Sequence, residues 1–219
     1  MVSCIVARVG PHSDIAELAK TSSVPVINAL SDLYHPLQAV TDILTIQEAF
    51  PKLEGLKVAW VGDANNVLYD LMIACGKLGI NVSIATPKEY PVDPTMLKIA
   101  REGADATGAT IECTTEPTVA VKDANVIVTD TWISMGQESE KAEKMREFAG
   151  YQVSMEMAQK GGAHKDWKFM HCLPRHQEEV DNEVFYSPRS LVFTEAENRL
   201  YAALAALEAF VVKKGKFEE

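Results

Sequence analysis

From residue 56 onward, the sequence alternates between short apolar segments and longer segments with the spacing of amphipathic helices. The apolar segments have the length of buried strands and lie near residues 57–61, 81–85, 109–113, 126–130 and 167–172. The helical segments between them lie near residues 65–78, 94–106, 117–122 and 138–160. A strand followed by a helix and another strand is the repeating unit of a parallel sheet. We therefore predict an α/β fold with a doubly wound parallel sheet.

A second, incomplete α/β unit is predicted before this sheet. Residues 2–9 form an apolar, β-type segment that we expect to be buried on both faces, and residues 24–27 predict a second strand. A short helix should join them, with Ser13 and Asp14 offering its N-cap. Because proteins seldom begin inside a core strand, we expect a segment upstream of Met1 to be missing.

Composition limits the kinds of partner. The chain has 219 residues, 47% of them hydrophobic, so it can bury a substantial core. Its net charge of −10 opposes binding to nucleic acid or to an anionic membrane surface. The four cysteines, Cys4, Cys75, Cys113 and Cys172, form no CxxC pair, which argues against a zinc site or disulfide framework and favours a reducing compartment. No apolar run reaches membrane-spanning length, and no targeting signal is recognisable.

The stretch from Trp167 to Arg175 joins the last predicted strand to side chains that carry chemistry. Pro174 lacks the backbone donor that would continue the strand, so Cys172 should lie at its carboxyl edge. In an open parallel sheet, ligands bind at that edge. Taken alone, the pattern fits equally well a Cys172 and a His171 that only fill the core.

Two further loops are predicted at the same edge of the sheet. Residues 62–66 turn into a helix without the G-x-G-x-x-G spacing of dinucleotide-binding proteins, which disfavours a dehydrogenase. The adjacent amides of Asn65 and Asn66 either cap that helix or recognise a carboxylate or amide. The fourth strand ends at Asp130, whose carboxylate suits an ammonium group. If the first and fourth strands are neighbours, these loops and Cys172 face one crevice, which predicts an active site.

Four motifs, taken together and in this order, resemble those of the ornithine carbamoyltransferase family. They are H-P-L-Q at 35–38, D-T-W-I-S-M-G at 130–136, H-C-L-P at 171–174 and E-A-E-N-R at 195–199. The first motif opens a predicted helix that ends near Pro51 and is shared with aspartate carbamoyltransferases, whereas S-M-G and H-C-L-P point to ornithine. The resemblance runs through essentially the whole chain.

The resemblance implies transfer of a carbamoyl group from carbamoyl phosphate to the δ-amine of L-ornithine. The products are L-citrulline and phosphate, as in arginine biosynthesis and the urea cycle, and neither a metal nor an organic cofactor is implied. The residues implied for carbamoyl phosphate are Arg8, His35, Gln38, Leu173 and Arg199. The residues implied for ornithine are Asn66, Asp130, Ser134, Met135 and Cys172. Cys172, His35 and Arg199 are implied as the catalytic set. Because a neutral amine can attack the carbonyl carbon directly, we predict that Cys172 orients the amine rather than attacking the carbonyl.

The resemblance also implies a domain organisation. Residues 1–50 correspond to the remnant of a carbamoyl-phosphate-binding domain, residues 51–195 to the ornithine-binding domain, and residues 196–219 to a helix that returns to the first domain. Family members carry an upstream S-x-R-T loop for the phosphate, which this sequence lacks. We therefore expect a chain that is truncated at its start and that makes no citrulline alone.

Two other interpretations remain open from the sequence. The first is a non-catalytic amino-acid-binding or regulatory fragment of the same fold. The second is an aspartate-type carbamoyltransferase, which would need basic groups for a second substrate carboxylate that the S-M-G and H-C-L-P loops lack. The family resemblance further implies a homotrimer and, in eukaryotic members, the mitochondrial matrix, with the cytoplasm as the alternative.

Overall fold

The computed structural model describes residues 2–133 and 141–216. Its main sheet has five strands in the order β5-β4-β3-β6-β7, and every neighbouring pair is parallel. The strands are β3 (Lys57–Val61), β4 (Asn81–Ala85), β5 (Ile111–Thr114), β6 (Val126–Val128) and β7 (Lys168–Met170). The predicted doubly wound parallel sheet is therefore confirmed, and the first strand of this sheet, β3, does lie beside the fourth, β6.

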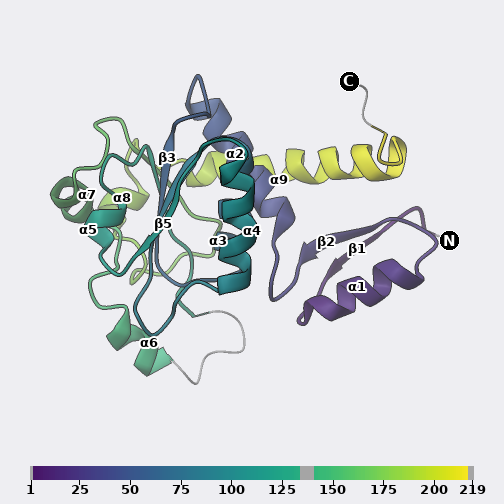
Figure 1. The fold of residues 1–219 in the computed structure, drawn as a ribbon, viewed down its shortest axis with the longest axis horizontal. Coiled ribbons are helices and arrows are strands. Elements are labelled where there is room, and N and C mark those ends of the chain that lie inside the picture. Colours follow the sequence, from purple (N-terminus) through teal and green to yellow (C-terminus); the bar gives the residue numbers. More distant parts are fainter. Residues whose placement is uncertain (1, 134–140, 217–219) are drawn as a thin grey trace.

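Helices cover both faces of this sheet because its central strands are apolar on both sides (Figure 1). Val58 and Trp60 of β3 enter one core cluster, and Ala59 and Val61 enter the other. The first cluster is covered by α3 (Asn66–Lys77) and α4 (Pro94–Asp105), which pack on each other. The opposite face carries α5 (Pro117–Ala120), α6 (Lys141–Glu147), α7 (Met155–Gly161) and α8 (Asn182–Phe185).

The predicted helix over residues 138–160 is wrong in one respect, because the described part contains two helices, α6 and α7. Gly150 lies between them with φ +93°, a conformation that ends a helix. The segment between the helices then becomes extended, and Val153 forms a parallel bridge with Val180.

The first part of the chain forms a separate small sheet. β1 (Ile5–Arg8) and β2 (Val26–Leu30) are parallel and joined by α1 (His12–Thr21). The expectation that residues 2–9 are buried on both faces is wrong: Val6 is 55% exposed, and strand residues alternate between part-buried and exposed. In a two-stranded sheet with one connecting helix, the helix covers only one face of the sheet.

The predicted N-cap of α1 is also wrong. The helix begins at His12, and neither Ser13 nor Asp14 caps it. The backbone N–H of His12 instead donates to Oδ1 of Asp32, at 2.8 Å. A side chain that follows β2 therefore accepts the hydrogen bond that a local cap would otherwise supply.

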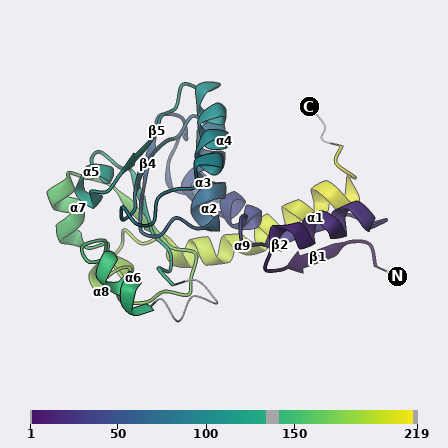
Figure 2. The same cartoon turned by 60° about the horizontal axis from the view of Figure 1, so that its bottom comes forward.

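Two helices connect the small sheet to the main one. α2 (Pro36–Ala49) packs against α9 (Val192–Leu207), which continues as one π-helical turn over Glu208–Val212. Figures 1 and 2 both show α9 running from the main sheet toward β1, β2 and α1. The predicted final helix is confirmed, although it begins at Val192 rather than at Glu195. Among the described residues, no helix is both long enough and apolar enough to cross a membrane.

Candidate active site

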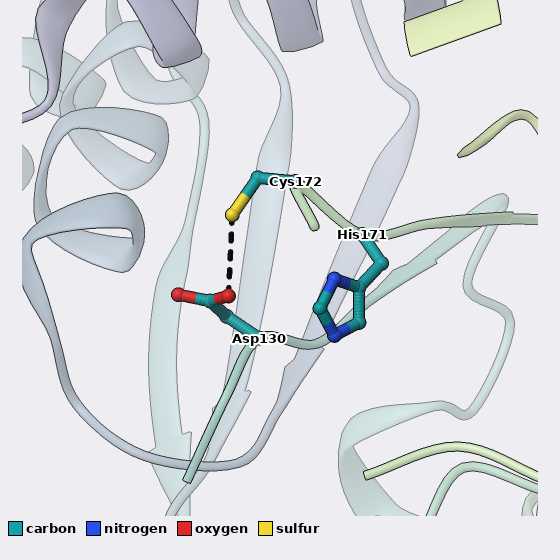
Figure 3. A group of neighbouring side chains, drawn as sticks. All are labelled: Asp130, His171 and Cys172. Atoms are coloured by element: carbon teal, nitrogen blue, oxygen red, sulfur yellow. Dashed lines mark hydrogen bonds between the residues drawn. The ribbon is translucent and has the colours of Figure 1, made fainter. Parts of the chain in front are cut away.

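Three loops meet at the carboxyl edge of the main sheet, after β3, β6 and β7. Asp130, which follows β6, is buried and accepts two hydrogen bonds. Nδ2 of Asn65 donates to its Oδ2 at 2.7 Å, and Sγ of Cys172 donates to its Oδ1 at 3.2 Å. Figure 3 shows the thiol directed at the carboxylate. The predicted convergence of these loops is therefore confirmed.

The two adjacent amides after β3 have different roles. Asn65 has extended backbone angles, and its Oδ1 caps α3 by accepting from the N–H groups of Val67 and Leu68. Asn66, the residue implied for ornithine, donates from Nδ2 to the carbonyl oxygen of Ser31 at 2.6 Å. Asn65 is therefore the amide that contacts Asp130. The capping interpretation of the sequence holds for Asn65, but its second contact was not foreseen.

The loop after β7 is fixed by two carboxyl groups. The backbone N–H of His171 donates to Oε2 of Glu195 at 2.9 Å, and Nε2 of its fully buried ring lies 2.9 Å from Oε2 of Glu179. Nδ1 of the same ring accepts from the N–H of Leu173 at 2.9 Å. Because Nδ1 is an acceptor, Nε2 carries the proton and donates to Glu179. Glu179 lies outside the motifs recognised in the sequence, and Glu195 opens the E-A-E-N-R motif without a predicted role.

Leu173 and Glu179 shape the rest of this loop. Leu173 has φ +60°, and its side chain packs against the core cluster on the α7 side of the sheet. Glu179 also accepts from the N–H of His176 at 2.9 Å and from its Nδ1 at 2.7 Å. Although burial opposes it, hydrogen bonds from His171 and His176 keep the pKa of Glu179 below its usual range. The loop therefore encloses a charged carboxylate.

Asp130, His171 and Cys172 bring possible metal-ligand atoms within 4.8 Å of one another (Figure 3). Neither ring nitrogen of His171 has a free lone pair, because Nδ1 accepts from Leu173 and Nε2–H faces Glu179. Burial, followed by the carboxyl groups of Asp130 and Glu195, raises the pKa of Cys172 well above its usual range. Cys172 could bind a metal only as a thiolate, and His171 only through a free imidazole lone pair. Cys172 is bonded to Asp130, and the ring of His171 is bonded to Leu173 and Glu179, so the three residues are not arranged as a ligand set.

A second group of side chains gathers at the start of α2. His35 is buried, and burial together with the charges of Arg199 and Arg8 lowers its pKa to about 4. The two guanidinium groups come from α9 and β1, and both residues are exposed. The imidazole is consequently neutral at pH 7 and lies beside two permanent positive charges. A buried neutral donor with adjacent guanidinium groups suits a phosphate and a polarised carbonyl.

Gln38 lies one turn further along α2 and is 1% exposed. Its Nε2 donates to Oδ1 of Asp42 at 2.8 Å and to Oε1 of Glu195 at 3.0 Å. Burial raises the pKa of Asp42 to about 7, and burial and the nearby Asp42 raise the pKa of Glu195 well above its usual range. Neither acid was singled out from the sequence. Their positions one helical turn from Gln38 and from Arg199 are the signal that could have found them.

The structure therefore brings most of the predicted residues into two groups. Arg8, His35, Gln38 and Arg199 gather around the start of α2 and the first half of α9. Asp130, Cys172 and Leu173 lie in the loops after β6 and β7, while Asn66 points to Ser31. Ser134 and Met135 lie outside the described residues. Glu195 contacts both groups, through Gln38 and through the backbone of His171.

A parallel α/β sheet with acid, thiol and imidazole groups at its switch point is the arrangement of α/β proteins that bind ligands at the sheet edge. Residues 54–210 match the Asp/Orn binding domain of aspartate/ornithine carbamoyltransferase, and residues 1–48 match its carbamoyl-P binding domain. The chain therefore belongs to the aspartate/ornithine carbamoyltransferase family.

Known relatives carry the same name across distant organisms. The chain is 62% identical, over 99% of its length, to the mitochondrial ornithine carbamoyltransferase of Coccidioides immitis, and 50% identical, over 100%, to the ornithine carbamoyltransferase of Saccharomyces cerevisiae. The crystal structure of the Coccidioides protein superposes with a TM-score of 0.93 at 59% identity, covering 100% of this chain and 69% of that one. The structure of the Pyrococcus furiosus ornithine carbamoyltransferase superposes with a TM-score of 0.92 at 46% identity, covering 99% of this chain and 68% of that one. The chain spans 62–66% of the first three curated relatives that it matches.

Proposed function

We propose that this chain takes part in carbamoyl transfer from carbamoyl phosphate to the δ-amine of L-ornithine, giving L-citrulline and phosphate. Relatives at 62% and 61% identity are named mitochondrial ornithine carbamoyltransferases, which supports the choice of reaction. The observation that carries the proposal is that Glu195 joins an anion-suited group around His35 and an ammonium-suited group around Asp130. The two groups have the opposite charge preferences that the two substrates require.

The group at the start of α2 is the proposed carbamoyl phosphate site. Arg8 and Arg199 supply the positive charge for the phosphate. Neutral His35 supplies a donor for the carbonyl oxygen, which becomes negative as the amine attacks. Gln38 keeps its Oε1 unbonded among the described residues and can therefore accept from the carbamoyl N–H₂ group.

The group at the sheet edge is the proposed amine site. Asp130 has an acceptor lone pair left on each oxygen after the bonds from Asn65 and Cys172, so it can pair with the α-ammonium of ornithine. The neutral δ-amine forms a bond to the carbonyl carbon, the bond from that carbon to the phosphate oxygen breaks, and the amine proton leaves with the phosphate. Cys172 keeps its thiol proton and orients the amine, because its pKa lies far above neutral pH. Most of the rate enhancement then comes from orientation and fixed charges.

We also propose a domain organisation, a cellular compartment and an oligomeric state for the protein. We take residues 1–50, 51–195 and 196–219 as the carbamoyl-phosphate part, the ornithine part and the returning segment. The change from one family match to the other, between residues 48 and 54, supports the first boundary. The printed names of the fungal relatives support the mitochondrial matrix. The family resemblance supports a homotrimer, which sedimentation equilibrium tests by the mass of the assembly.

The test joins this chain to the part of the Coccidioides immitis protein that it does not match, and assays citrulline formation. The parent chimera should make citrulline from carbamoyl phosphate and ornithine. Asp130→Asn should weaken ornithine binding far more than carbamoyl phosphate binding in calorimetry, because losing one partner of a partly buried ion pair costs roughly 2–5 kcal/mol.

Asp105→Asn is the matched control, since Asp105 is exposed at the end of α4. It should bind both substrates as the parent does. A parent chimera that makes no citrulline would refute the proposed reaction. Equal weakening of both substrates by Asp130→Asn would refute the role of Asp130 alone.

A further inference from the structure

A buried polar junction lies between the two proposed substrate sites. Glu195 is 2% exposed and accepts from Nε2 of Gln38 through Oε1, at 3.0 Å, and from the N–H of His171 through Oε2, at 2.9 Å. Asp42, 1% exposed, accepts from the same Nε2 at 2.8 Å. The junction connects α2, α9 and the loop after β7, which are distant in sequence.

This junction fixes which way the Gln38 amide faces. Its nitrogen donates to two carboxyl groups, and its Oε1 has no hydrogen-bond partner among the described residues although it is buried. Nδ1 of His35, at the N-cap of α2, is likewise buried and has no hydrogen-bond partner among the described residues. Leaving a buried polar atom unsatisfied is costly, so two such atoms three residues apart at the start of α2 indicate a place prepared for a polar ligand.

Glu195 carries a geometric constraint that a neutral amide cannot reproduce. Its two oxygens each accept from a donor, Nε2 of Gln38 on one side and the N–H of His171 on the other. A glutamine at this position has one acceptor oxygen, and its N–H₂ group would have to face the second donor. A carboxyl group is therefore required to hold both the amide and the loop.

We propose that Glu195, supported by Asp42, is a positioning residue that couples the two substrate sites. One oxygen of Glu195 keeps Oε1 of Gln38 directed at the carbamoyl N–H₂ group. Its other oxygen holds the backbone N–H of His171. The position of His171 fixes the adjacent Cys172, which is hydrogen-bonded to Asp130. Occupation of Gln38 is thereby transmitted to the amine site through one rigid side chain. This inference rests on the proposed function, because it assigns the ligand of Gln38.

The catalytic test uses the chimera described above. Glu195→Ala should raise the carbamoyl phosphate KM and lower kcat together, each by about tenfold or more, since the hydrogen bonds from Gln38 and from the N–H of His171 are both lost. The KM and kcat of Glu195→Gln should lie between those of the parent and of the alanine variant, because the glutamine keeps one of the two hydrogen bonds. Glu197→Ala is the matched control, since Glu197 is exposed on the same helix, and it should leave both constants unchanged.

A second readout separates coupling from a purely structural role. In ¹⁵N spectra, carbamoyl phosphate should shift both the Gln38 side-chain N–H₂ signals and the His171 backbone amide signal of the parent. In Glu195→Ala, saturating carbamoyl phosphate should still shift Gln38 but no longer His171. An alanine variant that keeps the His171 shift, or parent-like kcat and KM, overturns the inference. If the parent makes no citrulline, the proposed function fails, and the two spectra alone decide whether Glu195 couples the sites.

Discussion

Sγ of Cys172 donates a hydrogen bond of 3.2 Å to Oδ1 of Asp130, a residue 42 positions earlier in the chain. The bond requires the thiol proton, and the carboxylate beside it disfavours loss of that proton. Burial and the charge of Asp130 both raise the pKa of Cys172. The residue is therefore a donor at neutral pH and a poor nucleophile.

Because of this bond, Cys172 should be alkylated slowly by iodoacetamide at pH 8. Only the thiolate attacks, and burial raises the pKa of both cysteines, but it raises that of Cys172 much further. Cys172 should therefore react more slowly than the exposed Cys113. Asp130→Asn should speed the reaction of Cys172 and leave that of Cys113 unchanged, since it removes a negative charge that raises the pKa of Cys172. Mass spectrometry of each cysteine peptide over time measures both rates. A Cys172 that reacts as fast as Cys113 would contradict the assignment.

The buried ion pair between Lys144 and Asp63 should contribute strongly to stability. Nζ of Lys144 lies 2.6 Å from Oδ2 of Asp63, with side chains that are 2% and 8% exposed. Asp63→Asn should lower the free energy of unfolding by about 3–5 kcal/mol, because it removes one partner of a buried ion pair. Urea denaturation gives the value. Glu156→Gln, in the exposed pair with Lys160, is the control and should leave the midpoint unchanged; comparable losses in both would show that burial does not matter here.

Gly161 should not tolerate a side chain. A Cβ at this position in α7 would overlap Cγ2 of Val121 and lie 2.6 Å from the carbonyl oxygen of Thr118. Gly161→Ala should therefore lower the free energy of unfolding by roughly 1–3 kcal/mol through overpacking between α7 and α5. Gly10→Ala is the matched control, because a Cβ there meets nothing within 4 Å. Thermal unfolding that ranks the two variants in the reverse order would argue against the close packing of these helices.

His35 should make stability fall as the pH is lowered. Its pKa is about 4 in the folded protein and 6.5 in the unfolded chain, so between these values the unfolded chain binds more protons. The contribution is fully present above pH 6.5 and is lost as the pH falls toward 4; its size is about 3 kcal/mol. The difference in unfolding free energy between parent and His35→Asn should grow by this amount from pH 4 to pH 6.5.

The measurement is a series of urea titrations across that range. Comparing the two proteins at each pH cancels the opposing contribution of Asp42, whose raised pKa makes stability fall as the pH rises toward 7. A flat difference for His35→Asn would mean that the imidazole is not held neutral by the fold.

The periodicity of the sequence was sufficient to predict the main sheet and its switch point, because strand and helix spacing are local properties. The different contacts of Asn65 and Asn66 were not predictable, since they depend on which of the two residues takes the extended backbone angles of the N-cap. Glu179 was missed because its partners are brought together only by the folded loop. Likewise, the faces of β1 depend on what packs against them, and an apolar run alone does not specify that.

The packing of α9 on α2 also has a consequence for how the protein folds. Gln38 and Glu195 are separated by 157 positions, and Asn198, which donates to Thr45 and Glu48, by 153 and 150. Contacts that close such long loops form slowly, whereas neighbouring helices and strands such as α3 and β4 form through short ones. The main sheet can therefore assemble before α9 packs on α2 and brings Arg199 to His35.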